Sequence, residues 1–115
     1  TIADSISVNY LRNFFMTKDY LKKYNGEWIS VNDDEILGAS GFLAQSTGLF
    51  AEPASAAAYA GMVKYAQLNK IKPGSKNVVL LTGSGLKDVH SIRKGLRMPK
   101  AIEPNLQNLK ILIKP

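Results

Sequence analysis

Residues 77–88 read NVVLLTGSGLKD, an apolar run that ends at Thr82 and enters a loop containing Gly83 and Gly85. The run does not alternate between apolar and polar residues, which is the pattern of a strand covered on both faces. It therefore predicts a central strand of an α/β sheet. The two glycines predict a loop whose backbone approaches a ligand closely, and phosphate, nucleotide and cofactor ring are all candidates for that ligand.

Two phosphate-binding motifs match this loop poorly. The dinucleotide fingerprint G-x-G-x-x-G needs a third glycine where this chain has Asp88, a carboxylate at the place that pyrophosphate would approach. A P-loop follows its strand, whereas Gly74-Ser75-Lys76 precedes the apolar run and lacks the upstream glycine of the motif. The loop by itself therefore does not identify a nucleotide site.

The composition is that of a globular domain and excludes several kinds of site. The chain has 115 residues, 45% of them hydrophobic, with no cysteine and a single histidine, His90. Disulfides, thiolate nucleophiles, zinc–thiolate sites and a metal site built from histidines are therefore excluded. No run of about 18 apolar residues occurs, and residues 1–5 lack the basic and apolar regions of a signal peptide, so we expect a cytoplasmic protein with no membrane partner.

The net charge of +6 would favour binding to phosphate backbones, but the lysines are scattered along the chain. Basic residues cluster only at Arg93, Lys94, Arg97 and Lys100. A charge run of this kind is usually a solvated surface. We therefore expect no nucleic-acid partner.

The first half of the chain predicts two helices with a short strand between them. Apolar side chains at three- and four-residue spacing predict a helix over residues 10–24, ended by Asn25-Gly26, and residues 27–31 are rich in strand formers. Asn32 can then cap a second helix and Glu35 can complete a capping box. Metal binding by Asp33, Asp34 and Glu35 is the alternative interpretation of this acidic group.

Small residues are a feature of the next two helices. The second helix extends to Gly48 and contains Gly38 and Gly41, which we interpret as sites of close packing. A third helix begins near Ala51 with Pro53 in its first turn and extends to about Asn69. Its small residues would let a sheet or a ligand approach closely, and these residues are Ala56, Ala57, Ala60 and Gly61.

The chain reads as a single segment, 1–115, that ends in a tail over residues 89–115. The tail contains Pro99 and Pro104 before a short apolar element at 109–113 that is compatible with a strand. Two or three strands are few for an α/β sheet, and the chain has no initiating methionine. We therefore expect a fragment of a larger protein.

Four ordered motifs carry a family resemblance across almost the whole chain. They are IADSISV at 2–8, DDEIL at 33–37, GLFAEPASAA at 48–57 and LTGSGLKD at 81–88. In this order and spacing they resemble the C-terminal third of the threonine synthase family, which belongs to the tryptophan-synthase-like, fold type II group of pyridoxal-phosphate enzymes. The resemblance implies an α/β fold, a three-layer open and mostly parallel sheet flanked by helices. It also implies a parent enzyme, expected to be a homodimer, that converts O-phosphohomoserine and water to threonine and phosphate.

The same resemblance implies a cofactor site for pyridoxal 5'-phosphate. Thr82 would offer its hydroxyl to the pyridine nitrogen, and Gly83, Ser84 and Gly85 would let the backbone turn beside the ring. Glu52 and Ser55 would lie near the cofactor, and Ala3 to Ser7 would help to wall the pocket. A hydroxyl can bond a neutral pyridine nitrogen, which makes the cofactor a milder electron sink than a carboxylate partner would.

The family's catalytic lysine, its phosphate-binding glycine loop and the asparagine over the ring would all lie upstream of this chain, on the N-terminal remainder of the enzyme. Lys87 matches a structural lysine of the family pattern, so we expect no catalytic residue and no metal in this segment. Ser84 replaces a frequent histidine, and Asn9-Tyr10-Leu11 replaces a frequent Gly-x-Pro, which leaves the amino-acid substrate open. The alternatives are a fold type II enzyme acting on another amino acid, and a non-catalytic domain that binds a phosphorylated small ligand at TGSGLKD.

Overall fold

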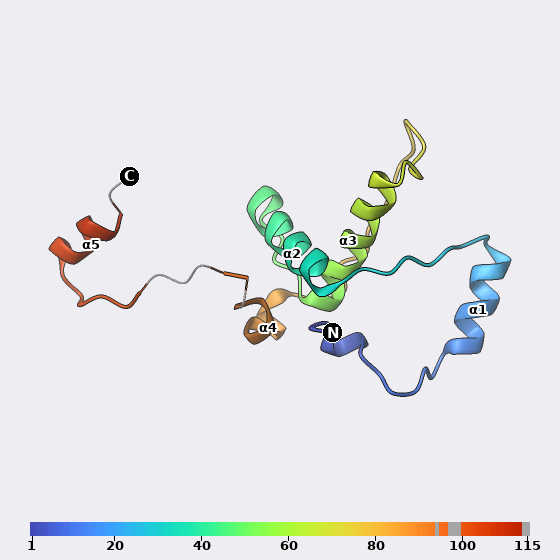
Figure 1. Cartoon of the computed structure of the whole chain (residues 1–115), viewed down its shortest axis with the longest axis horizontal. Helices are drawn as coiled ribbons and strands as arrows, with labels where there is room; N and C mark the ends of the chain where they lie inside the picture. Colours follow the sequence, from blue (N-terminus) through green and yellow to red (C-terminus); the bar gives the residue numbers. More distant parts are fainter. Residues whose placement is uncertain (94, 97–99, 114–115) are drawn as a thin grey trace.

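The computed structural model describes residues 1–93, 95–96 and 100–113, and its regular elements are helical. In chain order they are the 3-10 turn η1 (Asp4–Ile6), the helices α1 (Phe14–Lys23), α2 (Asp33–Thr47) and α3 (Pro53–Gln67), the 3-10 turn η2 (Gly85–Lys87), and the helices α4 (Val89–Arg93) and α5 (Leu106–Leu112). Figure 1 shows α2 and α3 packed together at the centre, with α1 and α5 at opposite ends of the molecule.

The hydrophobic core lies between α2 and α3. Ile36, Ala39 and Leu43 are buried at three- and four-residue spacing, so they form one face of α2. Ala56 and Ala60, one turn apart on α3, face this side with 0% and 4% of their surface exposed. Because these alanines project only methyl groups, the two helices pack closely.

The predicted role of the small residues on α3 therefore needs correction. Ala56 and Ala60 pack against α2 and not against a sheet. Gly61 is buried beneath the extended segment 26–32, where an added Cβ would lie 3.1 Å from Cγ2 of Ile29. The covering elements are thus a helix and an extended segment.

The ends of α2 confirm the predicted signals. The Glu35 amide donates to Oδ1 of Asn32 at 2.9 Å, and the Asn32 amide donates to Oε2 of Glu35 at 2.7 Å, which completes the capping box. At the other end, Gly48 adopts a left-handed φ of 75° and its amide donates to the carbonyl of Ala44. α3 likewise begins with Pro53 at its first position, as predicted.

Gly38 and Gly41 are not sites of close packing, contrary to our interpretation. A Cβ built on either residue would meet no atom within 4 Å. Neither glycine is therefore explained by a neighbour within the described residues.

The predicted sheet is not confirmed. The described residues contain no β-strand, and residues 77–82 and 27–31 are extended without a ladder partner. The single bridge found there pairs Ala51 with Ser84 in antiparallel fashion. Val78 and Leu80, two residues apart and therefore on one face of the run, are 85% and 73% exposed. Val79 and Leu81 on the other face are half-buried, and Leu81 packs against the core, so only one face of the run is partly covered and not both as predicted. A strand needs neighbours for its backbone N–H and C=O groups, and the described chain places none beside residues 77–82.

α1 begins at Phe14 and not at Tyr10, because the first helical bond runs from the Thr17 amide to the carbonyl of Asn13. Asn25, with a left-handed φ of 51°, follows its last turn as predicted. Figure 1 shows that α1 stands apart from the α2–α3 pair at the end of two extended segments. Its apolar side chains are consequently exposed, Phe15 to 79%.

The tail contains helices, including one over the short apolar element whose sequence is compatible with a strand. Residues 106–112 form α5, because the Asn105 side chain accepts the amide proton of Asn108 at 2.9 Å and caps its first turn. The basic cluster is described only in part, since Lys94 and Arg97 lie outside the described residues. Arg93 and Lys100 are exposed, in agreement with a solvated surface.

Two side-chain clusters tie the extended segment 26–32 to α3 and to the turn that follows it. The Glu27 carboxylate accepts from the hydroxyl of Tyr65 and, at 2.8 Å, from Nζ of Lys70. Nζ of Lys64 bonds the carbonyl of Ser30 at 2.8 Å and the carboxylate of Glu35 at 3.1 Å. The hydrogen bonds to Glu27 raise the pKa of Lys70 and the pKa of Tyr65 above their ordinary values.

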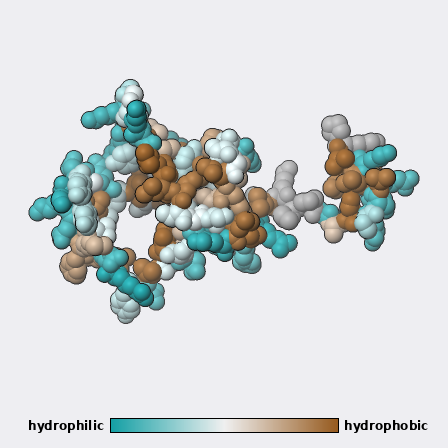
Figure 2. Space-filling view, turned by 180° about the vertical axis from the view of Figure 1, so that it is seen from behind, coloured by the Kyte–Doolittle hydropathy of each residue, from teal (hydrophilic) through white to brown (hydrophobic). Residues whose placement is uncertain are grey.

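The molecule is elongated, with extents of 63 × 38 × 18 Å. Figure 2 shows hydrophobic side chains on the surface of the central body and on the outlying α5. Exposed examples are Val78, Leu80, Leu106 and Ile111. Within the described residues, no helix combines the length and the apolar character needed to cross a membrane.

Candidate functional site

A hollow of about 630 Å³ lies beside the glycine loop. Two chain segments line it, one ahead of α3 and one that contains the loop. The lining residues are Gly48, Leu49, Phe50, Ala51, Leu81, Thr82, Gly83, Ser84 and Leu86. The hollow thus joins two of the motifs that carry the resemblance, GLFAEPASAA and LTGSGLKD.

The start of α3 holds Gly83 by both of its backbone groups. The Gly83 amide donates to Oγ of Ser55 at 2.7 Å, and the Glu52 amide donates to the carbonyl of Gly83 at 3.1 Å. Helix N-termini leave amides without intrahelical partners, and the N-cap residue Glu52 uses its amide in this way. The loop position is therefore set by the first turn of α3.

A second connection joins the loop to the segment before α3. The Gly85 amide donates to the carbonyl of Phe50 at 2.8 Å, next to the bridge between Ala51 and Ser84. The carbonyl of Ala51 also accepts from the buried hydroxyl of Ser40 on α2 at 2.9 Å. These bonds anchor the hollow to the α2–α3 core.

Thr82 lies at the rim of the hollow, and its hydroxyl is 3.2 Å from Oγ of Ser55. From the apolar run before it we expect this threonine to be partly shielded from water, but it is exposed. The expectation is wrong for the same reason as the sheet: no neighbouring strand covers residues 77–82. Ser55, in contrast, is only 1% exposed.

The loop glycines make room for the chain's own side chains. A Cβ on Gly83 would overlap the carboxylate of Glu52, which is itself buried, and a Cβ on Gly85 would come within 2.7 Å of the Phe50 ring. Glu52 and Phe50 thus account for both glycines without a ligand. The close approach that the loop sequence predicts is made, within the described residues, by protein atoms.

Ala3 lies in the core and does not line the hollow. It is 1% exposed and belongs to the cluster that contains Ile36 and Ala56. Its segment is tied to α2 because the Asp33 carboxylate accepts from the Thr1 hydroxyl at 2.6 Å and from the Ile2 amide at 3.2 Å. This contact between the N-terminal segment and the α2 N-terminus has no signal in the sequence, because it depends on long-range packing.

The structure thus brings together six of the seven residues predicted for the cofactor site. Thr82, Gly83 and Ser84 line the hollow, while Gly85, Glu52 and Ser55 lie directly behind this lining through the bonds and contacts given above. The seventh, Ala3, is in the core.

The described residues that line the hollow offer hydroxyl groups and apolar walls, and none of them carries a charge. Thr82 and Ser84 supply the hydroxyls, and Leu49, Phe50 and Leu81 are among its apolar walls. This chemistry suits a flat, largely apolar ring that carries a hydrogen-bond acceptor. Among the described residues, no group of three or more acidic or histidine side chains is arranged to hold a metal ion.

The loop amides are largely occupied by the protein itself. Besides Gly83 and Gly85, the Leu86 amide donates to Oγ of Ser84 at 3.3 Å and the Lys87 amide donates to the carbonyl of Ser84 at 3.0 Å. A phosphate cradle needs several backbone amides that point at the anion. These amides are not available for that role.

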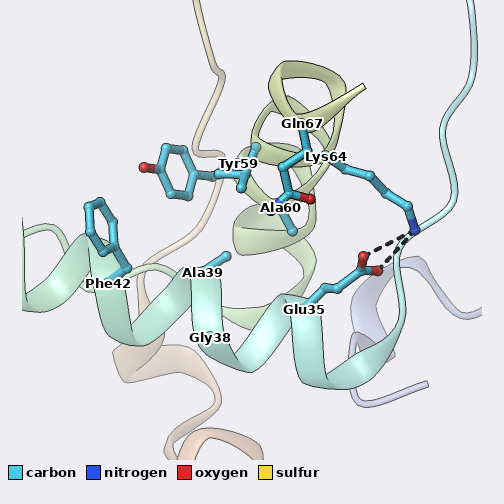
Figure 3. A pocket seen from close by; sticks show the side chains of 9 residues that line it. Glu35, Gly38, Ala39, Phe42, Tyr59, Ala60, Lys64 and Gln67 are labelled. Carbon is cyan, nitrogen blue, oxygen red and sulfur yellow. Dashed lines mark hydrogen bonds and ion pairs between the residues drawn. The ribbon is translucent and has the colours of Figure 1, made fainter. Parts of the chain in front are cut away.

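A second hollow, of about 430 Å³, lies between α2 and α3 and was not predicted. Figure 3 shows the paired Glu35 and Lys64 at one end and Phe42 and Tyr59 at the other. The two rings stack with centroids 6.0 Å apart, and the charges of the pair neutralise each other. Helix periodicity places Phe42 away from the core, but only the packing of α2 on α3 reveals the hollow.

The comparison with protein families agrees with the motifs around the first hollow. The family model described as pyridoxal-phosphate dependent enzyme matches residues 1–83, which end in the loop. The chain belongs to the pyridoxal-phosphate-dependent enzyme family.

Curated relatives of this chain are threonine synthases. The threonine synthase of Halalkalibacterium halodurans is 39% identical over 105 residues, which is 91% of this chain and 30% of the relative. That of Bacillus sp. (strain ULM1) is 41% identical over 88 residues, 76% of this chain and 25% of the relative. That of Methanocaldococcus jannaschii is 33% identical over 114 residues, 99% of this chain and 28% of the relative. The chain thus spans less than a third of the length of these relatives, and it resembles threonine synthases over most of its own length.

Proposed function

We propose that this chain is the C-terminal part of a pyridoxal-phosphate-dependent threonine synthase, which converts O-phosphohomoserine and water to threonine and phosphate. The observation that carries the proposal is the Thr82 hydroxyl at the rim of an uncharged hollow, in a chain similar to threonine synthases over 91% of its length. The parent would be a cytoplasmic homodimer, and its amino-acid substrate would bind beside the cofactor.

The residues of the hollow fit pyridoxal phosphate in chemistry. When bound, the cofactor supplies an electron sink for reactions at amino acids. In this chain Thr82 would donate a hydrogen bond to the pyridine nitrogen, and Phe50 and Leu49 would exclude water from the site. Among the described residues, neither lysine nor arginine lines the hollow, so the cofactor phosphate and the covalent lysine would be held by the N-terminal remainder of the enzyme.

The fold type II sheet of the parent would include residues 77–82 as a strand. Val78 and Leu80 are exposed in this chain, and the layer that covers this face of the sheet in the complete enzyme would bury them. Burial of apolar area at about 25 cal/mol per Å² would then favour docking of the two parts. Residues 89–115 would form a C-terminal tail that follows this domain.

The alternative of a domain that binds a phosphorylated ligand at TGSGLKD has less support. The amides of Gly83, Gly85, Leu86 and Lys87 are bonded within the protein, and the lining found in the described part of the chain contains no basic side chain. A fold type II enzyme for another amino acid is the second candidate, because Ser84, at a position often occupied by histidine in the family, lies on the hollow itself.

The first test is Thr82→Val in the full-length enzyme. The change keeps the shape of the side chain and removes the hydroxyl, so we expect turnover to fall by roughly ten- to a hundredfold, the equivalent of about 1.4 to 2.7 kcal/mol. Because the buried Ser55 hydroxyl loses its Thr82 partner, we also expect a lower melting temperature, from a loss of about 1 to 3 kcal/mol in the free energy of unfolding. Single-turnover rate and thermal unfolding are measured on one preparation.

Thr82→Ser is the matched control, because it retains the hydroxyl and should keep most of the rate. An unchanged rate in Thr82→Val, with or without a loss of stability, would remove Thr82 from the cofactor site and with it the observation that carries the proposal.

A further inference from the structure

Ser55 is a buried hydroxyl placed between the loop backbone and Thr82. It is 1% exposed and sits in the first turn of α3. Its Oγ accepts the Gly83 amide proton at 2.7 Å and lies 3.2 Å from Oγ1 of Thr82. Thr82 itself is exposed at the rim of the hollow. A buried group therefore stands directly behind the hydroxyl that faces the ligand.

The protons of these two hydroxyls can be accounted for. A serine hydroxyl has one proton to donate and two lone pairs that accept, and the Gly83 amide occupies one lone pair of Ser55. If Thr82 donated to Ser55, the Ser55 proton would need a further acceptor, and Oγ has no other partner among the described residues. Buried donors rarely stay unpaired. Ser55 therefore donates to Oγ1 of Thr82, which leaves the Thr82 proton free to point elsewhere.

We propose that Ser55 is a positioning residue that turns the Thr82 hydroxyl into a hydrogen-bond donor directed at the bound ring. The proposal rests on the proposed function, in which Thr82 meets the pyridine nitrogen of the cofactor. The bond from Ser55 occupies one of the two lone pairs of Thr82 Oγ1 and strengthens the Thr82 hydroxyl as a donor. Thr82 therefore bonds an unprotonated nitrogen more strongly than a protonated one, which would have to use the remaining lone pair. Ser55 thereby selects the neutral ring, and with it a milder electron sink.

The test measures protonation of the ring nitrogen directly. Pyridoxal phosphate labelled with ¹⁵N in the ring is bound to the full-length enzyme, and its nitrogen resonance is followed as a function of pH. In Ser55→Ala the Thr82 hydroxyl is no longer polarised as a donor, and both of its lone pairs can accept a hydrogen bond from a protonated ring nitrogen. We expect the pKa of that nitrogen to rise by about one unit, a tenfold change in the protonation equilibrium.

A double substitution separates positioning from general disruption. Ser55→Ala combined with Thr82→Val should show the pKa of Thr82→Val alone, because Ser55 acts only through the threonine. Ser55→Thr, which retains a hydroxyl, should restore the parental value. Ser55→Cys is close to serine in size but donates weakly, so it should resemble Ser55→Ala and serves as the test if the smaller alanine impairs folding.

The outcomes distinguish this inference from the proposed function. If Thr82→Val shifts the nitrogen pKa and Ser55→Ala does not, the role of Ser55 is overturned while the contact of Thr82 stands. The role of Ser55 is also overturned if Ser55→Ala shifts the nitrogen pKa by the same amount with Thr82 present and with Thr82→Val. If Thr82→Val leaves the nitrogen pKa unchanged, the proposed contact with the ring fails, and the role of Ser55 fails with it.

Discussion

The glycines of this chain divide into two groups according to what surrounds them. Gly85 lies against the Phe50 ring, where a Cβ would come within 2.7 Å of ring atoms. Gly38 on α2 has no atom within 4 Å of the position where a Cβ would lie. The residue type does not distinguish the two positions. Only at Gly85 would a larger side chain collide with neighbouring atoms.

This difference gives a prediction for the stability of the 115-residue chain. Gly85→Ala should lower the free energy of unfolding by about 1 to 3 kcal/mol, because the Phe50 ring must move to admit the methyl group. Gly38→Ala should raise it by up to about 1 kcal/mol, because alanine loses less conformational entropy in a helix. Urea unfolding followed by circular dichroism measures both changes.

Gly41→Ala is the matched control on the same helix and should behave like Gly38→Ala, since its surroundings are equally open. Stabilisation by Gly85→Ala would contradict the packing of the loop on Phe50.

At the scale of elements, two carboxylates join segments that are distant in sequence. The Asn32 amide, followed by Lys64, holds the pKa of Glu35 below its ordinary value of 4.5. The hydrogen bond from Lys70, followed by that from Tyr65, holds the pKa of Glu27 below the same value. Glu35 caps α2 and contacts α3, and Glu27 ties the extended segment to α3.

Because both pKa values are lower in the folded chain than in the unfolded one, the ionised carboxylates favour folding. Their contribution is fully present above pH 4.5, the ordinary pKa, and is lost as the pH falls through the lowered values. We therefore expect the midpoint of urea unfolding to decline as the pH falls below 4.5, with the α2 helix signal lost at lower urea concentration. Circular dichroism at a series of pH values measures this decline.

Glu35→Gln should flatten part of this acid dependence, because glutamine can bond the Asn32 amide but does not titrate. Asp34→Asn is the control, since Asp34 is an exposed carboxylate in the same turn. An acid dependence that is the same in Glu35→Gln as in the parent chain would contradict the role of the capping carboxylate.

At the scale of the whole molecule, the chain is far less compact than its length allows. Its radius of gyration is 18.4 Å, compared with about 13 Å for a compact domain of this length. Its accessible surface is 9790 Å², compared with about 6,200 Å² for a compact protein of this mass. The excess comes from α1, α5 and residues 77–82, whose apolar side chains lie exposed. These values agree with the proposal that the chain is part of a larger enzyme.

We predict that this chain alone is catalytically inactive. Under the proposed function the covalent lysine lies on the remainder of the enzyme, and this segment supplies only non-covalent contacts to the cofactor. Pyridoxal phosphate added to the chain should therefore give no specific visible absorption band. A stoichiometric band that borohydride reduction fixes to Lys87 would contradict the prediction. Lys87→Arg, which keeps the charge but cannot be captured in this way, distinguishes specific from non-specific labelling.

Sequence alone was sufficient where the cause lies within one or two helical turns. Asn32 and Glu35 form their capping box three residues apart, Pro53 begins α3, and Gly48 ends α2 with a positive φ. The motif order also pointed to the family and to Thr82 with its loop. Each of these features depends on local geometry, or on a pattern that survives along the chain.

Tertiary structure decided everything that depends on distant partners. Residues 77–82 have no strand neighbours in the described chain, and Thr82 is exposed. Gly83 and Gly85 leave room for the side chains of Glu52 and Phe50. Tertiary packing also places Ser55 behind Thr82, 27 residues away in the chain. A strand, a buried hydroxyl and a closely packed glycine each need a partner group that tertiary packing supplies. The local sequence cannot specify that partner.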